Sequence, residues 1–395
     1  GTNTDGSGTA PGSFSAGDIF IVRNGSNLTT NGALALNSTG INAVTLQINN
    51  GGTLTASHSI TFVDGGSGTN FVIENNGTYA HNLATDVSTT VFTATTRDFQ
   101  TGSTINFTQS GTHNLTSFGF GVNVYNLGIT GTTITVNLSG GAFNISGTFT
   151  ISSGNTFDLT STASSAAIFG TPSGLSGTGT LRSGSSFNPS MPAGQSWPFT
   201  VEFYRVGAQT IPSGTFTNLN ATGGNRTIGS GSTVTITGTF TPGGGTYTLT
   251  NSTIEFAQNG ALNIPNLPYN NLTISGTGTK TMTTDLTIAG ALVISNSNAD
   301  LDINGNTLTL NGNGSSFTGD LLGSSTSNLV IGGTLGSSPT IKFHTGANTL
   351  RDLTLNRTGA SAGVTLGSDL TIVRRLNLTN GNLNTANHIL TLQSS

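Results

Sequence analysis

Short runs in which apolar and polar side chains alternate are the feature that most limits how this chain can fold. The run Thr233–Thr241 is an example: Val234, Ile236 and Phe240 fall on one face and the five threonines on the other. Successive side chains of a strand point to opposite faces, so this run predicts a strand with one buried face and one wet face. Similar runs alternate with Gly-, Asn- and Ser-rich turns, and no long stretch has helical periodicity.

The predicted strands also recur at a fixed spacing. Three pairs of similar segments are offset by 53 residues; in the first pair, one segment begins at residue 201 and the other at residue 254. More divergent copies begin at Ile105 and Ile341. The matched segments are Val201–Phe203 with Ile254–Phe256, Ile211–Pro212 with Ile264–Pro265, and Phe216–Leu219 with Tyr269–Leu272.

Repeated, half-polar strands favour one architecture. A single strand of this kind cannot bury its apolar face alone, whereas stacked coils build one continuous core. We therefore expect an all-β fold, a parallel β-solenoid (β-helix) built from irregular repeats. At about 20–25 residues per coil, the chain would form roughly 15–20 coils. A string of small β-sandwiches is the alternative, but such domains need about 100 residues each and the repeat step is shorter.

We divide the chain into two predicted regions. Residues 1–98 hold the N-terminal capping and first coils, and residues 99–395 continue the solenoid with repeats of 53 residues and longer. An irregular insertion is expected near residues 187–199, since its prolines are pushed to corners or insertions. Met191, Trp197 and Phe199 make this segment either a loop packed over the stack or a contact loop, because exposed Trp is a common interface anchor.

Composition excludes several functional classes. Only 7% of the residues are charged, and 11 basic against 15 acidic residues give a net charge of −4. Nucleic-acid binding needs a concentrated basic footprint, which this charge does not supply. The absence of cysteine excludes disulfides and cysteine-based zinc sites. No apolar run approaches the roughly 18 residues that span a bilayer. The chain begins at Gly1 without a signal peptide, which we interpret as a cleaved signal or a fragment.

The two ends of the chain carry apolar strands that are candidates for assembly. Open ends of a solenoid expose unpaired strand edges, and such edges can pair with a neighbouring subunit. Head-to-tail pairing of this kind turns a module into a filament. The expected assembly residues are Ile19, Phe20, Ile21, Val22, Ile389, Leu390 and Leu392.

Three segments carry a family resemblance. Val201–Gly214 and Asn271–Met282 resemble a repeat common in large exported surface proteins of the Bacteroidota, and Ile73–Asn82 is similar to another recurrent element of those proteins. The resemblance extends from about residue 40 onward. It implies an adhesin, a gliding-associated protein or a fibre-like surface layer, secreted as type IX secretion cargo. Many members carry a C-terminal sorting domain, and none is recognisable here.

Catalytic and metal-binding patterns are sparse. Asp300 and Asp302 share one strand face, where we expect them on the solvent side, capping a turn. Asp64–Gly68 is a single loose approximation to a calcium-binding repeat. The Asp-Asp and His-Gly patterns of polygalacturonases and a plausible nucleophile elbow are missing. We therefore expect no catalytic residue, cofactor or metal, and no enzyme. The five scattered histidines, expected on the surface, are His58, His81, His113, His344 and His388.

The sequence thus predicts a non-catalytic structural protein of the bacterial cell surface, a rigid module of a fibre or adhesin that self-associates. A carbohydrate-binding module is the alternative, with Tyr204, Tyr247 and Tyr269 exposed in line. Ice binding would need the threonine rank of Thr233–Thr241 repeated in register on successive coils. Polysaccharide degradation would need two carboxylates brought together by the fold.

Overall fold

The secondary structure is almost entirely β. The computed structural model describes residues 17–39, 43–65, 68–84, 91–115, 122–139, 142–160, 168–186, 189–334, 338–359 and 362–393. Within these ranges there is one short 3-10 turn, η2 (Val91–Thr93), and no α-helix. No helix of the described residues is long and apolar enough to cross a membrane. The strands pair in parallel and stack as a β-solenoid of about 15 turns, which confirms the predicted fold class.

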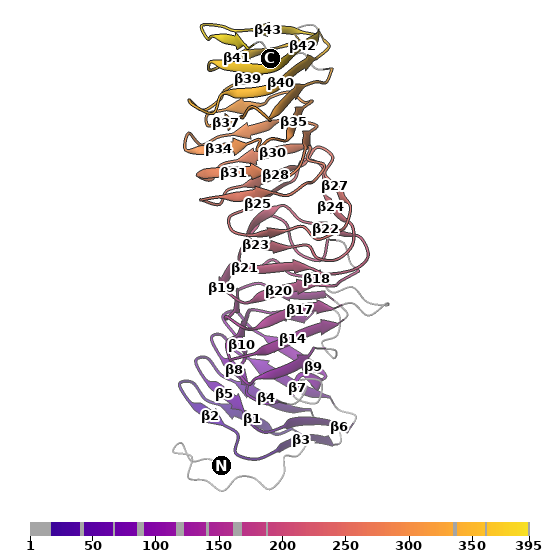
Figure 1. Ribbon diagram of the computed structural model, residues 1–395. Coiled ribbons are helices and arrows are strands. Elements are labelled where there is room, and N and C mark those ends of the chain that lie inside the picture. Colours follow the sequence, from indigo (N-terminus) through magenta and orange to yellow (C-terminus); the bar gives the residue numbers. More distant parts are fainter. Residues whose placement is uncertain are drawn as a thin grey trace. The chain divides into compact units, whose positions relative to one another are not determined.

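The chain divides into two compact units. Unit 1 comprises residues 1–192 and 197–205, and unit 2 comprises residues 193–196 and 206–395. Figure 1 shows the strands of each unit lying edge to edge as successive rungs. The predicted boundary at residue 98 lies inside unit 1 and stays a prediction.

The strands of unit 1 form five parallel sheets, and β21 belongs to it from Trp197 onward. In sheet order they are β1 (Ile19–Val22), β4 (Val44–Ile48), β7 (Thr69–Ile73) and β9 (Thr96–Phe99); β19 (Gly174–Gly177), β16 (Thr148–Ile151), β13 (Asn126–Ile129), β10 (Thr104–Phe107), β8 (Thr78–His81), β5 (Thr53–Ala56) and β2 (Asn27–Thr29); β11 (Gly111–Asn114), β14 (Ile134–Ser139), β17 (Thr156–Thr160), β20 (Thr180–Ser183) and β21 (Gln195–Phe203); β12 (Val122–Val124), β15 (Ala142–Ile145) and β18 (Ile168–Phe169); β3 (Leu34–Thr39) and β6 (Ile60–Gly65).

Unit 2 repeats this arrangement, with β26 (Phe240–Thr241) also pairing with β23. Its sheets are β23 (Gly214–Asn220), β25 (Thr233–Ile236), β28 (Thr253–Phe256), β30 (Asn271–Ile274), β33 (Leu292–Ile294) and β36 (Ser316–Phe317); β22 (Gln209–Ile211), β24 (Arg226–Ile228) and β27 (Tyr247–Thr248); β29 (Leu262–Ile264), β31 (Gly278–Met282), β34 (Ala299–Asp302) and β37 (Asp320–Leu322); β32 (Leu286–Ile288), β35 (Thr307–Leu310), β38 (Asn328–Ile331), β40 (Thr349–Asn356), β42 (Leu370–Asn380) and β44 (Leu390–Leu392); β39 (Thr340–Ile341), β41 (Gly363–Leu366) and β43 (Asn382–Asn384).

Strand register fixes the length of each turn. In β1, Ile19 lies opposite Thr45, 26 positions later, whereas Thr253 of β28 lies opposite Asn271, only 18 positions later. Apolar residues stack on apolar residues along each column, as Ile254, Leu272 and Leu292 do in the buried interior of unit 2. Each buried aliphatic side chain contributes about 1.5–3 kcal/mol, so the columns supply most of the stabilising energy of each unit.

The 53-residue sequence repeat is not the axial period. Leu272 stacks through Ile254 and Val234 onto Gly214, and not onto its sequence counterpart Leu219. A turn here takes about 20 residues, and 53 is not a multiple of that length. The repeat therefore records related strand sequences that occupy different places on the stack.

The interpretation of residues 187–199 as an exposed contact loop is wrong. Phe187 and Asn188 lie outside the described residues, and Gln195–Phe199 form the first half of β21. Met191, Trp197 and Phe199 are only 2%, 1% and 1% exposed. The Trp197 and Phe199 rings lie 5.9 Å apart between their centroids, within the interior. Burial of these apolar side chains outweighs the tendency of the prolines to interrupt a strand.

Candidate functional site

A polar pocket opens on the surface of unit 2. It encloses about 480 Å³ and lies on turns that follow one another along the stack. Its lining is dominated by hydroxyl, amide and charged side chains, in contrast to the apolar interior beneath. The lining residues are Asp320, Lys342, Phe343, His344, Thr345, Asn348, Gly367, Ser368, Asp369 and His388.

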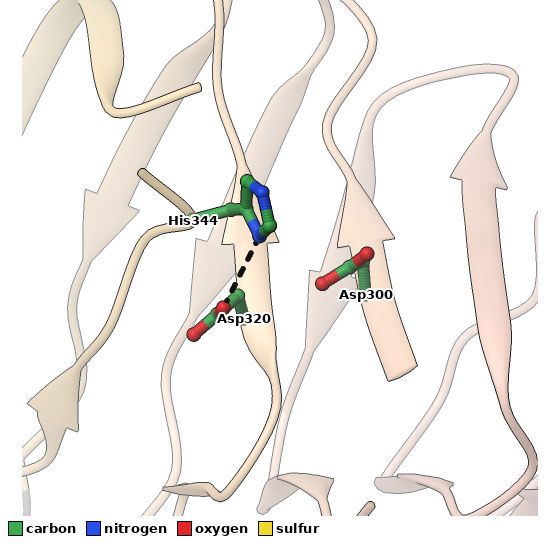
Figure 2. Close-up of side chains that lie close together, drawn as sticks. All are labelled: Asp300, Asp320 and His344. Carbon is green, nitrogen blue, oxygen red and sulfur yellow. Dashed lines mark ion pairs between the residues drawn. The ribbon is translucent and has the colours of Figure 1, made fainter. Parts of the chain in front are cut away.

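Strand register brings two carboxylates together beside this pocket. Asp300 of β34 lies directly opposite Asp320 of β37. An isolated parallel bridge joins Leu321 to Phe343, which sets Lys342 and His344 on the next turn. Side chains of one parity share a face, so the polar residues turn outward while Leu321 and Phe343 face the core. Figure 2 shows the His344 ring directed toward Asp320, with Asp300 on the neighbouring strand.

Asp320 is the centre of this group. Lys342 Nζ lies 2.8 Å from its Oδ1, and His344 Nδ1 lies 3.4 Å from its Oδ2. The Lys342 contact is ionic without hydrogen-bond alignment, because Oδ1 has no hydrogen-bond partner. Lys342 also donates to the Thr318 carbonyl oxygen at 3.2 Å. The Asp320 side chain, which is 16% exposed, therefore lies close to both the ammonium of Lys342 and the imidazole of His344.

Asp300 is less well satisfied than Asp320. Within the part of the chain that the structure describes, no group donates a hydrogen bond to its carboxylate. Burial raises the pKa of Asp300; the charge of Asp320 raises it further, and His344 and Lys342 oppose the shift without cancelling it. A carboxylate oxygen of each aspartate and a ring nitrogen of His344 lie within 4.8 Å of one another. The three groups have the donor types and separations of a metal-ligand set.

A second carboxylate–imidazole pair lies on the other side of the pocket. His388 Nδ1 is 3.6 Å from Asp369 Oδ1, and the same oxygen accepts a hydrogen bond from the Ile389 backbone at 2.9 Å. Asp369 is 57% exposed, so solvent screens this pair more than the Asp320 pair. It serves as an internal comparison for the Asp300–Asp320–His344 group.

Unit 1 carries a charged column of a different kind. Asp158, Arg182 and Glu202 lie opposite one another on β17, β20 and β21. Arg182 Nε donates to Glu202 Oε2 at 2.6 Å, and its Nη1 lies 3.4 Å from Asp158 Oδ2. The guanidinium also stacks 4.3 Å from the centroid of the Tyr204 ring. The cation thus joins two anions from the turns on either side of it.

Tyr204 completes this column. Its hydroxyl donates to Asp158 Oδ1 at 2.8 Å. Burial raises the pKa of Asp158, because the hydrogen bond from Tyr204 and the charge of Arg182 do not fully offset desolvation. Burial and the bond to Asp158 also raise the pKa of Tyr204. Each of the four side chains, Asp158, Arg182, Glu202 and Tyr204, has a partner inside the column, which fits a structural clamp.

Three basic residues of unit 2 are fully buried. Lys280 Nζ donates to the carbonyl oxygens of Gln258, Gly260 and Thr277 at 3.1, 2.7 and 2.9 Å. Arg357 and Arg226 likewise donate to backbone carbonyls, Arg357 to Gly312 at 2.8 Å. Burial lowers the pKa of Lys280. These cations satisfy carbonyl groups at corners of the stack, and they are not available to an external anion.

The other candidates from the sequence have different outcomes. Asp302 caps a turn as expected, since its Oδ1 accepts from the Asn304 backbone at 2.8 Å. The expectation that the histidines are all on the surface is wrong, because His81 and His113 are fully buried with ring centroids 5.1 Å apart. Among the described residues, only His344 joins a metal-ligand group.

Among the described residues, the tyrosine row and the threonine rank that the alternatives named are not formed as surfaces. Tyr247 and Tyr269 are buried and donate to the backbone oxygens of Pro242 and Pro265. In the threonine rank, Thr235 is followed on the next two turns by Glu255 and Thr273. A charged residue inside the rank breaks the regular array that ice binding needs.

The predicted assembly strands lie at the edges of their sheets. Within the described residues, β1 pairs only with β4, and β44 pairs only with β42. Ile19 and Ile21 are 56% and 46% exposed, and Ile389 and Leu392 are 66% and 59% exposed. Phe20 and Leu390 are half-buried and Val22 is buried. Each of these outer strands thus carries exposed apolar side chains.

Sequence reasoning considered Asp300 and His344 separately, did not single out Asp320 or Lys342, and did not predict that these residues lie together. Asp320 follows Asp300 by 20 positions, and His344 follows Asp320 by 24, each close to one turn. These spacings are compatible with the predicted coil length of about 20–25 residues, but they place the three side chains together only when the strand register is known. Comparison with family models, with curated proteins and with solved structures finds no match for this chain.

Proposed function

We propose that this chain is a non-catalytic, rigid solenoid module of an extracellular fibre or adhesin on a bacterial surface. The observation that carries the proposal is that polar side chains as well as apolar ones connect each turn to the next. Thr148 Oγ1 donates to Asn126 Oδ1 at 3.0 Å, and Asn137 donates to Asn114 at 2.9 Å. Bonds of this kind hold the turns in register and suit a load-bearing spacer.

The charged residues support the same proposal. In unit 1, Arg182 joins the turns that carry Asp158 and Glu202. In unit 2, Lys280 satisfies backbone oxygens at a corner. These groups are used between turns and do not surround a substrate. Location at the cell surface rests on the resemblance of the sequence to exported repeat proteins.

Self-association through the end strands is the second part of the proposal. Among the described strands, β1 and β44 are the outermost of their sheets, and their exposed residues Ile21 and Leu392 are apolar. Pairing of one copy's β44 with β1 of a second copy would satisfy backbone groups and cover both patches. Ile21→Lys and Leu392→Lys would each weaken such pairing.

Immunogold labelling of the bacterium that encodes the chain tests the surface role. Antibodies against unit 2 should label intact cells along surface fibres, and deletion of the gene should remove the fibres or the adhesion. Labelling only after permeabilisation would contradict it. Sedimentation at high concentration tests the second part separately: isolated monomers would overturn head-to-tail assembly and leave the module role standing.

A further inference from the structure

We propose that Asp300, Asp320 and His344 bind a divalent transition-metal ion of the zinc class, which would link three successive turns of unit 2. The ligands come from β34, from β37 and from the segment after β39. The inference rests on the geometry of these side chains and does not depend on where in the bacterium the chain acts.

The separations of the ligand atoms match one shared ion. Zinc binds imidazole nitrogen and carboxylate oxygen at about 2.0–2.2 Å, so two tetrahedral ligands lie roughly 3.3 Å apart. His344 Nδ1 and Asp320 Oδ2 are 3.4 Å apart. The Asp300 oxygen lies within 4.8 Å of both. A rotation of the Asp300 side chain, which has no hydrogen bond to break among the described residues, closes the remaining gap.

The donor types select the ion. Imidazole favours zinc and its neighbours in the first transition series, whereas calcium takes six to eight oxygen ligands. Here Asp320 and Asp300 supply oxygen, His344 supplies nitrogen, and Asp320 and His344 also line the pocket. A fourth position would therefore face the pocket and take water, as in three-ligand zinc sites.

The local charge also favours a cation. Two aspartates stand on adjacent turns, and of these two the ammonium of Lys342 forms an ion pair with Asp320. The other charged groups near the pocket, Asp369 and His388, pair with each other. Lys342 is 40% exposed and can turn into solvent when a dication replaces it.

Calorimetric titration of the EDTA-treated full chain with zinc chloride tests the proposal. We expect one site per chain. Asp320→Asn and His344→Gln should each weaken the affinity at least tenfold, and Asp300→Asn should weaken it by a similar factor. His388→Gln is the matched control, because His388 lines the same pocket outside the ligand group, and it should leave the affinity unchanged. Lys342→Met should tighten binding several-fold by removing the competing ammonium.

Cobalt chloride provides a second readout. Tetrahedral cobalt absorbs visible light, and His344→Gln should change that spectrum while His388→Gln should not. Far-UV circular dichroism without metal confirms that each variant is folded, and Lys342→Met remains informative if an aspartate variant is not. The proposal is overturned if zinc is not taken up, if uptake is the same in wild type and in His344→Gln, or if Lys342→Met weakens it.

Discussion

Units 1 and 2 each carry a column of charged side chains on successive turns, but the charges come in different orders. In unit 1 the order is Asp158, Arg182, Glu202, and the cation stands between two anions. In unit 2, Asp300 and Asp320 are adjacent, and Lys342 comes after them. Both columns hold two carboxylates and one cation, but Arg182 contacts both carboxylates of the first, whereas Lys342 contacts only the Asp320 carboxylate of the second among the described residues. The order of charges along a column therefore decides whether it is a closed clamp or an open ligand set.

The parallel register makes this order matter. Stacked turns hold equivalent residues about 4.8 Å apart, so each side chain has two fixed neighbours above and below. Burial is the largest cause of the raised pKa at both Asp158 and Asp300. At both residues a neighbouring carboxylate adds to the rise in pKa and nearby cations oppose it. The difference is that Tyr204 donates a hydrogen bond to Asp158, whereas no described residue donates one to Asp300.

The largest expected effect is at the centre of the closed column. Arg182→Met should destabilise unit 1 by about 2–3 kcal/mol, because it leaves Asp158 and Glu202 without their shared cation. This loss of unfolding free energy is small for the breaking of a buried ion pair, because the Arg182 side chain is 35% exposed and solvent screens its charge. Trp197, the single and buried tryptophan, reports the unfolding of unit 1 by its fluorescence in urea.

Arg351→Met is the control for that experiment. Arg351 is 43% exposed, lies in unit 2 and pairs with Asp352 at 3.3 Å, so its loss should leave the Trp197 transition unchanged. If Arg182→Met shifted the transition no more than the control does, the clamp would have no energetic role.

A smaller effect of opposite sign is expected in the open column. Asp300→Asn should stabilise metal-free unit 2 by about 0.5–1 kcal/mol at pH 7, since it removes repulsion between partly exposed like charges. The corresponding Asp158→Asn should not stabilise unit 1, because it removes an ion pair. Calorimetric unfolding in EDTA measures both variants.

The same substitution should change the pH dependence. Because the folded pKa of Asp300 lies above its ordinary value of 3.8, the folded state binds more protons there. The contribution of Asp300 to the free energy of unfolding is fully present below about pH 4, and it is lost as pH rises through the raised pKa. Wild type should therefore lose more stability than Asp300→Asn between pH 4 and pH 7.

Asp352 provides the contrasting case for the pH experiment. The hydrogen bond from Arg374 lowers the pKa of Asp352, so its contribution is present above about pH 4 and lost as pH falls. Asp352→Asn should therefore flatten the acid side of the curve. An identical pH curve for wild type and Asp300→Asn would contradict the proposed repulsion.

The smallest expected effect is at Lys342. Lys342→Met should destabilise metal-free unit 2 by less than about 1 kcal/mol, because the ion pair with Asp320 is partly exposed and holding a long lysine side chain in one geometry costs conformational entropy. The loss should shrink in 0.5 M sodium chloride, where screening is stronger. Thermal unfolding at two salt concentrations measures this, and a loss that does not depend on salt would assign the effect to packing instead.

The fold could be predicted from the sequence because the alternation in runs such as Thr233–Thr241 reflects the geometry of a strand directly. The burial of Trp197 was also present in the pattern: Trp197, Phe199, Val201 and Phe203 share one parity. The neighbouring prolines, which favour a loop, obscured that signal.

The candidate site could not be predicted in the same way. Turn length varies from 17 to 26 residues with the corners, as the pairings of Gln209 and Ile19 show. One residue more or less in a corner changes which side chains stack, so Asp300, Asp320 and His344 are unrelated until the register is known.

A double-mutant cycle on the two columns tests the role of charge order most directly. It measures the coupling energy between Asp300 and Asp320, and between Asp158 and Arg182, from the unfolding free energies of single and double variants in EDTA. The account predicts couplings of opposite sign: unfavourable between the two aspartates, so that Asp300→Asn stabilises only while Asp320 is present, and favourable between Asp158 and Arg182. Couplings of the same sign, or no coupling between Asp300 and Asp320, would contradict it.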